Sequence, residues 1–141
     1  MKKILLIISE GFEEIETIST IDICRRAGLI VDICALEENI VIGAHNISIK
    51  ADLIITKIAD LFNYDMIVLP GGIPNAYNLA KHKKVQALLK EAKISKKYIA
   101  AICAAPYALH KAGVLNKYYT CYPSFEEKIS LEGYDENASV V

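Results

Sequence analysis

Unbroken apolar runs recur along this chain, and each is followed by a segment with helical spacing. A strand that is covered on both faces shows such a run, without polar alternation. We therefore predict buried strands in KKILLIIS (2–9), LIVDICAL (29–36), YDMIVLP (64–70) and KYIAAI (97–102). Helices are predicted at 12–27, from Pro74 to about Ala92 with a break near Lys81, and at 104–113. This strand–helix–strand repetition predicts an α/β fold, with a mostly parallel sheet and helices on both faces.

Shorter elements are predicted between and after these. IVIGAHNISIKADLII (40–55) has the pattern of short strands around a turn, and YYTCYP (118–123) that of one short strand. ASVV (138–141) is predicted to begin another strand, at which the sequence stops. With 141 residues, 53% of them hydrophobic, the chain is predicted to be a single domain, 1–141, that buries about 70% of its unfolded surface.

Charge and cysteine content favour a cytoplasmic protein without a nucleic-acid or membrane partner. The net charge of −1 provides no field that would attract nucleic acid or anionic lipid. The apolar run after Lys3 has only five residues, too few for a signal peptide or a membrane span. The four cysteines contain no Cys-x-x-Cys pair, so we expect no zinc site, and reduced thiols.

Three loops of the predicted sheet carry residue types that an active site uses. In a parallel sheet, ligands bind beyond the carboxyl ends of the strands. The stretches that reach this edge are 10–16, 70–74 and 102–106. We expect the functional residues to come from these three loops.

Cys103 lies where a predicted strand turns sharply into a helix. A turn that projects one side chain into a cleft requires small neighbours, and here they are Ala100, Ala101, Ala104 and Ala105. The turn resembles a nucleophile elbow without its glycines. A helix that begins at Ala104 would direct free N–H groups at the sulfur and favour the thiolate. The alternative is a thiol that only packs. We predict a reactive Cys103 whose thiol pKa lies well below the usual ~8.5, unlike the other three cysteines.

Glu16 is the candidate acid–base residue at the same edge. On a helical wheel of 12–27 it lies within an apolar face, whereas Glu13 and Glu14 point away. The other members of that face are Phe12, Ile15, Ser19, Ile23 and Ala27. A carboxylate in such a place needs a partner or a proton, unless its head reaches water. We predict that Glu16 is protonated while Cys103 is a thiolate, and that it donates a hydrogen bond to the sulfur.

A glycine pair, Gly71-Gly72, ends the third long strand. Backbone N–H groups without a neighbouring Cβ can approach a ligand closely, as an oxyanion hole requires; the alternative is a plain turn. A Cys–His hydrolase needs a base beside its nucleophile, but Ala104 follows the cysteine. His110 lies two helical turns further on, and His45 is predicted to lie in a solvated turn.

The motifs EGFEEIE, VLPGG and AAICAAP, together with RRAG and TCYP, resemble the ThiJ/PfpI superfamily. The similarity spans the whole chain and is closer to the clade of the Parkinsonism-associated deglycase and its bacterial relatives. It implies a three-layer flavodoxin-like sandwich. Members of the family continue through a further strand and a final helix, so we expect this chain to be truncated at its C-terminus, after Val141.

The resemblance also implies roles for individual residues. Cys103 would be the elbow nucleophile, easily oxidised to the sulfinate, and Glu16 the protonated carboxyl beside it. Gly72 and Ala104 would supply backbone N–H groups to the oxyanion. Tyr122 stands where some members have a histidine, which makes it a candidate third partner. No metal or cofactor is implied.

The implied activity is that of a cofactor-free, cysteine-dependent glyoxalase III or protein deglycase, which acts on 2-oxoaldehydes or glycated amines. The alternative is a non-enzymatic, redox-responsive chaperone or stress protein that responds through Cys103. A PfpI-type peptidase is less favoured, because it has a histidine where this chain has Ala104. An amidotransferase-like hydrolase needs a downstream His–Glu pair, for which only His110 is present.

The helix at 12–27 is also predicted to form an interface between two copies of the chain. It has a second apolar group, Ile18, Ile21 and Cys24, besides the face that contains Ile15 and Ile23. One apolar stripe is enough to cover a sheet, so two indicate burial on both sides. We predict a homodimer through this helix, as the resemblance also implies.

Overall fold

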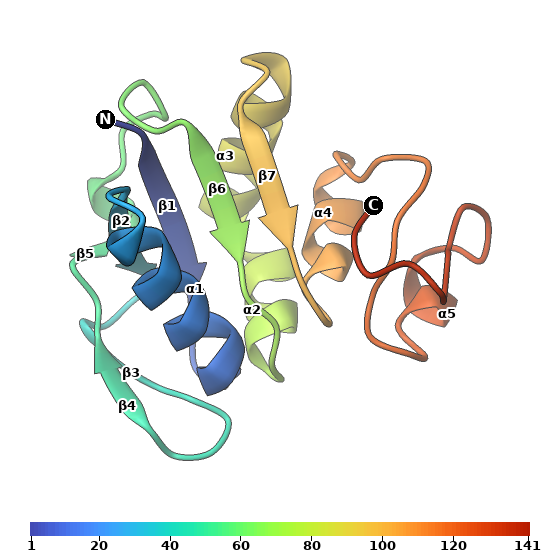
Figure 1. The fold of residues 1–141 in the computed structure, drawn as a ribbon, viewed down its shortest axis with the longest axis horizontal. Coiled ribbons are helices and arrows are strands. Elements are labelled where there is room, and N and C mark those ends of the chain that lie inside the picture. Colours follow the sequence, from blue (N-terminus) through green and yellow to red (C-terminus); the bar gives the residue numbers. More distant parts are fainter.

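Five strands form one parallel sheet in the computed structural model, which describes residues 1–141 (Figure 1). Their order is β5-β2-β1-β6-β7. They are β1 (Lys3–Ile8), β2 (Ile30–Ala35), β5 (Leu53–Ile54), β6 (Met66–Leu69) and β7 (Tyr98–Ala101). All pairings within this sheet are parallel. A separate antiparallel hairpin consists of β3 (Ile40–Ile42) and β4 (Ser48–Lys50). The predicted α/β fold with a mostly parallel sheet is confirmed.

Helices lie on both faces of the sheet (Figure 1). One face carries α1 (Glu14–Arg26), and the other carries α2 (Asn75–Lys81), α3 (Lys83–Ile94) and α4 (Pro106–Ala112). The side chains of β1 alternate between two apolar clusters, because successive residues of a strand point to opposite faces. Ile4, Leu6 and Ile8 join Ile21 of α1, whereas Leu5 and Ile7 join the apolar residues of α2, α3 and α4. Burial on both faces explains why β1 has no polar residue after Lys3.

Two short helical turns complete the chain: the 3-10 turn Ile55–Lys57 and α5 (Glu126–Ile129). The predicted break near Lys81 is confirmed, since α2 ends there and α3 begins at Lys83. None of the helices has the length and apolar character needed to cross a membrane.

The buried face of α1 differs from the prediction. Ile15 and Ile23, which were expected to pack on the sheet, are 75% and 65% exposed. The buried residues of the helix are Glu14, Thr17 and Ile21. The helical wheel included Phe12, but α1 begins only at Glu14, because the Glu13 carboxylate caps it by accepting a hydrogen bond from the Glu16 N–H. The face predicted by a wheel that started at Phe12 is therefore rotated relative to the face of α1 that contacts the sheet.

The C-terminal part of the chain also differs from the prediction. YYTCYP and ASVV form no strands; the segment after α4 contains α5 and one isolated bridge between Tyr119 and Tyr134. A strand requires a partner for its backbone groups, whatever its own sequence pattern. The sheet ends at β7, so neither segment joins it, and the backbone pairing of the first segment with the chain near Tyr134 is limited to a single bridge.

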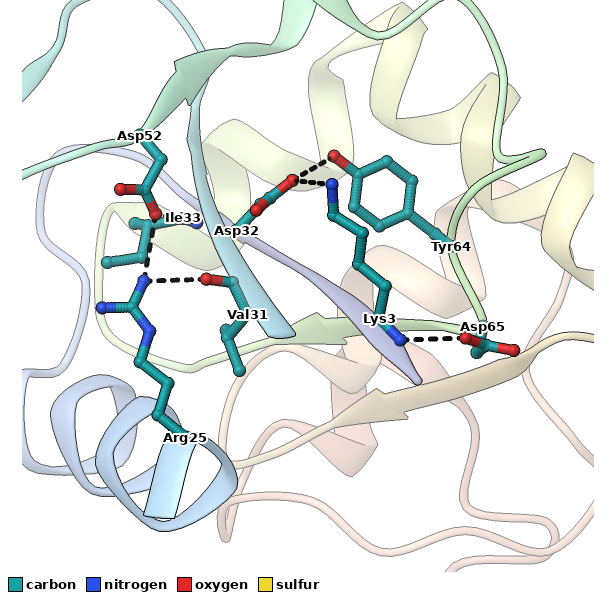
Figure 2. A network of polar contacts seen from close by, with 8 residues as sticks. All are labelled: Lys3, Arg25, Val31, Asp32, Ile33, Asp52, Tyr64 and Asp65. Carbon is teal, nitrogen blue, oxygen red and sulfur yellow. Dashed lines mark hydrogen bonds and ion pairs between the residues drawn. The ribbon is translucent and has the colours of Figure 1, made fainter. Parts of the chain in front are cut away.

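Charged side chains close the amino-terminal edge of the sheet, opposite the predicted site (Figure 2). The Asp32 carboxylate accepts a hydrogen bond from the Tyr64 hydroxyl at 2.6 Å and pairs with the Lys3 ammonium at 2.7 Å. Asp52 pairs with Arg25 at 3.1 Å, and it also accepts a hydrogen bond from a backbone N–H of β2. Burial alone would raise the pKa of Asp32, but the hydrogen bonds from Lys3 and Tyr64 lower it overall.

This lowered pKa predicts that Asp32 stabilises the fold at neutral pH. Asp32→Asn should lower the free energy of unfolding by about 1–3 kcal/mol at pH 7, because it removes a charge-assisted pair that is largely shielded from water. A carboxyl whose pKa is depressed on folding contributes stability above its unfolded pKa and loses it as the pH falls through the folded value. The difference between variant and wild type should therefore shrink below pH 4 or so.

Urea unfolding at several pH values measures this difference. The matched control is Asp22→Asn, which removes an exposed pair with Arg26 one helical turn away and should cost less than about 0.5 kcal/mol. Equal effects of the two substitutions at pH 7 would contradict the stabilising role of Asp32.

Candidate active site

Cys103 occupies a strained turn at the carboxyl end of β7. The strand ends at Ala101, and Cys103 has a φ of 60°, in the left-handed region that residues with a Cβ rarely adopt. α4 begins at Pro106, two residues later than predicted, and has only seven residues. The strained backbone is the feature that a nucleophile elbow requires, and such strain persists only where the surrounding structure holds it.

Glu16, from the first turn of α1, meets Cys103 at the loop after β6. Its Oε2 accepts a hydrogen bond from the Gly71 N–H at 2.8 Å, and its carboxyl group lies near enough to the Cys103 sulfur to raise the pKa of the thiol. Gly71 leaves the space in which the two side chains meet. A Cβ at this position would lie 2.6 Å from the Cys103 Cβ and 2.7 Å from Glu16 Oε2. The three predicted loops therefore converge on one point.

Two backbone N–H groups reach the Cys103 sulfur, those of Ala104 and Gly72. Both lower the pKa of the thiol, because hydrogen bonds to sulfur favour its charged form. Gly72 has a φ of 92°, and a Cβ there would lie 2.2 Å from the Gly11 carbonyl oxygen. Only glycine can bring the backbone so close to the loop after β1. Gly72 and Ala104 are the two residues for which the family resemblance implies a role in an oxyanion hole, and that role stays a prediction.

The pKa of Cys103 is raised overall, so the prediction of a lowered value is wrong for a site with an ionised Glu16. Burial is the largest cause, and the charge and hydrogen bond of Glu16 raise the pKa further. The two backbone N–H groups only offset part of this. α4 is short and begins two residues later than predicted. The sulfur therefore does not lie at the N-terminus of a long helix. Burial and the neighbouring Glu16 charge therefore both favour the protonated thiol of Cys103.

The other cysteines have different surroundings. Cys34 lies in the core, where burial raises its pKa to about 12. Burial raises the pKa of Cys121 to about 11. Cys24, on α1, is half-buried. Neither Cys34 nor Cys121 is a thiolate near neutral pH, as predicted.

Glu14 is buried beside the site, although the helical wheel placed it toward solvent. Its carboxylate is 4% exposed and accepts two hydrogen bonds from His45, from the backbone N–H at 2.5 Å and from the ring Nδ1 at 2.8 Å. Burial alone would raise the pKa of Glu14, but these bonds lower it, and they raise the pKa of His45. The contact pins the turn between β3 and β4 to the start of α1.

Glu13, Glu14 and His45 are also the residues whose ligand atoms could hold a cation, since these atoms lie within 4.8 Å of one another. Both carboxylates, however, already accept hydrogen bonds from the protein. These bonds account for the cluster without an ion.

Tyr122 contacts Cys103 through its backbone. The Tyr122 N–H donates a hydrogen bond to the Cys103 carbonyl at 2.7 Å, whereas the Tyr122 residue is 56% exposed. His110 lies in the last turn of α4, at the end away from Cys103. The groups that surround the sulfur are therefore a carboxyl and two amides.

Comparison with known proteins shows the family of the chain. The sequence profile of the DJ-1/PfpI family matches residues 2–141. The chain belongs to the DJ-1/PfpI family. This finding confirms the resemblance noted in the sequence motifs.

Relatives in the DJ-1/PfpI family come from plants and animals. The crystal structure of Drosophila melanogaster DJ-1beta has a TM-score of 0.93 at 34% identity, covering 99% of this chain and 76% of that one. Glutathione-independent glyoxalase DJR-1.2 of Caenorhabditis elegans is 31% identical, covering 97% of this chain and 74% of that protein. Protein DJ-1 homolog B of Arabidopsis thaliana is 36% identical over 92% of this chain, which spans only 30% of the plant protein.

One residue that positions this DJ-1/PfpI site escaped the sequence reasoning. Asn75, fully buried at the start of α2, donates hydrogen bonds to the Pro70 and Gly71 carbonyls at 2.9 and 3.0 Å. Its Oδ1 accepts from the Ser9 N–H at 2.7 Å. The amide side chain thus ties the loops after β1 and β6 together. The sequence signal for Asn75 is an asparagine three residues after a glycine pair. The carbonyl groups of a buried turn need hydrogen-bond donors, and an asparagine side chain can supply them.

Proposed function

We propose that the chain is a cofactor-free glyoxalase that converts 2-oxoaldehydes into 2-hydroxy acids through Cys103 and Glu16. The observation that supports this most strongly is the arrangement at the sulfur. A thiol, a carboxyl group that can exchange its proton, and two backbone N–H groups meet at one point. The similarity to a relative named as a glutathione-independent glyoxalase supports the same reaction.

The first step is addition of the Cys103 sulfur to the aldehyde carbon. The oxygen becomes an alkoxide, which the Gly72 and Ala104 N–H groups stabilise before it takes up the proton of the Cys103–Glu16 pair. The product is a hemithioacetal. Because the Cys103 thiol brings its own proton, no external acid is needed for this step.

The second step moves a proton between two carbons. The Glu16 carboxylate removes the hydrogen of the former aldehyde carbon, which gives an enediol, and then returns the proton to the neighbouring carbon. The result is a thioester of a 2-hydroxy acid on Cys103. Hydrolysis by one water releases the acid and regenerates the thiol. Attack of the same sulfur on a sugar-derived adduct of an amine would account for deglycation.

Methylglyoxal turnover tests the proposal. The purified chain should consume methylglyoxal and release lactate, and Cys103→Ser should lose this activity by at least about 10³-fold, because the hydroxyl is a far weaker nucleophile. Cys24→Ser is the matched control and should keep wild-type turnover. Full turnover by Cys103→Ser would show that the sulfur is not the nucleophile.

A redox-responsive stress protein is the second candidate, favoured by the half-buried Cys103 thiol at the surface of the site. In that case hydrogen peroxide should switch on suppression of aggregation of an unfolded client protein in a light-scattering assay. A chain that suppresses aggregation only after oxidation, and that never consumes methylglyoxal, would favour this candidate over the enzyme.

We propose that the chain forms a homodimer through α1, on a corrected face. Ile21, expected at the interface, is only 8% exposed within the subunit, whereas Ile15, Ile18 and Ile23 are exposed. Exposed isoleucines on one helix form an apolar patch of the kind that monomers avoid. A two-fold contact here would place the two sites near the symmetry axis, since Glu16 lies on the same helix.

Ile18→Glu should convert the dimer into a monomer or an aggregate without touching Cys103, because it buries a charge at the contact. The matched control is Ile94→Glu at the end of α3, which is 82% exposed and should leave the assembly unchanged. Static light scattering measures the molar mass. A stable wild-type monomer, or a dimeric Ile18→Glu variant, would contradict this interface.

A further inference from the structure

Cys121 lies next to Cys103, although the two residues are 18 positions apart in the sequence. The segment after α4 returns to the elbow, where the N–H of Tyr122 donates its hydrogen bond to the Cys103 carbonyl. Both cysteines pack against the same small cluster of Ala76, Ala104 and Phe125. The sequence shows no Cys-x-x-Cys motif, so only the fold brings these two thiols together.

The backbone hydrogen bond limits the distance between the two residues. The 2.7 Å contact joins the carbonyl oxygen of Cys103 to the nitrogen that follows Cys121. With standard bond lengths, this places the two Cα atoms no more than about 7.5 Å apart. A disulfide spans Cα–Cα distances of about 4.4–6.8 Å. Because Cys121 lies outside any helix or strand, the segment can adjust to that spacing without breaking a regular element.

A carboxyl group stands beside Cys121. Glu126, in the first turn of α5, has an enclosed Oε2 that accepts no hydrogen bond, and its own backbone N–H bonds to the Cys121 sulfur. Burial and, after it, the negative charge of Glu126 together raise the pKa of Cys121 to about 11. Cys121 therefore holds its proton until an acceptor takes it, and Glu126 Oε2 is an acceptor without another partner.

We propose that Cys121 is the resolving thiol for an oxidised Cys103, with Glu126 as the proton acceptor. A hydroperoxide transfers one oxygen to the Cys103 sulfur, which becomes a sulfenic acid, and the peroxide is reduced to water or an alcohol. The Cys121 sulfur then attacks the Cys103 sulfur, and its proton passes by way of Glu126 to the departing hydroxyl group, which leaves as water as the disulfide forms. An external thiol restores both cysteines by exchange.

The disulfide would keep Cys103 from further oxidation. A sulfenic acid without a thiol neighbour continues to the sulfinic acid, which thiols do not reduce. The proposal rests on the reactivity of Cys103 that the proposed function also assumes, but it needs no aldehyde substrate. It gives Cys121 and Glu126, which take no part in the glyoxalase steps, a role in the redox chemistry of the site.

Hydrogen peroxide treatment followed by mass spectrometry tests this. The reduced chain is exposed to peroxide and its intact mass is measured; the remaining thiols are then alkylated and the tryptic peptides are measured. We expect the wild type to lose about 2 Da and to yield a linked pair of peptides that contain Cys103 and Cys121. Cys121→Ser should instead gain about 32 Da at Cys103 under the same conditions. Cys121→Ala serves as a second variant if the serine disturbs the fold.

Two further variants sharpen the result. Cys34→Ser removes a core thiol away from the site and should leave the linked pair unchanged in any folded protein. Glu126→Gln removes the proton acceptor and also a charge that raises the pKa of Cys121, so disulfide formation should be slower than in the wild type at neutral pH and should recover as the pH rises and the thiolate forms without an acceptor. A wild type that reaches the sulfinic acid as fast as Cys121→Ser, or a chain that forms no linked pair, overturns the proposal. Methylglyoxal turnover without a disulfide would overturn the resolving role of Cys121 and leave the proposed function standing. A disulfide without turnover would overturn the proposed function and leave the resolving role standing.

Discussion

Glu16→Gln should lower kcat for methylglyoxal by about 10²–10⁴-fold, while KM changes little. The glutamine oxygen can still accept the hydrogen bond that the Gly71 N–H donates to Glu16 Oε2. The amide cannot carry a proton between the two substrate carbons, however. The loss should therefore fall on the chemical step and not on binding or folding.

A second measurement separates this role from a structural one. The charge of Glu16 raises the pKa of Cys103, so its neutral replacement should lower that pKa below the wild-type value. The pH profile of iodoacetamide labelling at Cys103 should shift to lower pH in Glu16→Gln. Glu10→Gln, an exposed residue at the same edge of the sheet, is the matched control and should change neither kcat nor the labelling profile. Full glyoxalase turnover in Glu16→Gln would rule out the proton shuttle.

Gly71→Ala should reduce kcat/KM by about 10²-fold or more, although it adds a single methyl group. The new Cβ would lie 2.6 Å from the Cys103 Cβ and 2.7 Å from Glu16 Oε2, distances at which one side chain must move. A misplacement of about 1 Å in a reacting group costs this much in rate. Overpacking should also lower the free energy of unfolding by about 1–3 kcal/mol.

Gly28→Ala is the matched control for this substitution. Gly28 has a φ of 82° and open space around its Cα, so alanine there strains the backbone without meeting any other atom. We expect the free energy of unfolding to fall by about 1 kcal/mol. The activity per folded molecule should equal that of the wild type. Methylglyoxal kinetics and urea unfolding measured on both variants would show whether the activity follows the site or the stability. Equal activity in the two variants would contradict the close packing inferred around Cys103.

Several features followed from the sequence because they depend on neighbouring residues. An apolar run such as that of β1 can only be a strand covered on both faces, and the alternation of such runs with helices leads to a parallel sheet. The small residues on both sides of Cys103 identify a tight turn. Gly72 could be placed at the site for a similar reason, since a glycine pair at a strand end exposes backbone N–H groups.

Glu16 was predicted correctly as a neighbour of Cys103, but from a helix face that proved to be rotated. The wheel placed Ile15 and Ile23 on the face toward the sheet, whereas both are exposed and the charged Glu14 is buried. Burial of Glu14 depends on His45, which lies 31 residues away in the sequence. No local pattern records such a partner, because the hydrogen bonds that offset desolvation come from another part of the fold.

The sequence by itself determined the parallel α/β architecture, the elbow cysteine and the three loops that converge on it. Only the tertiary structure decided which way the pKa of Cys103 moves and which second thiol stands beside it. The physical reason is the same in both cases. A pKa depends on burial and on charges within a few ångströms, and Glu16 and Cys121 reach those distances only after the chain has folded.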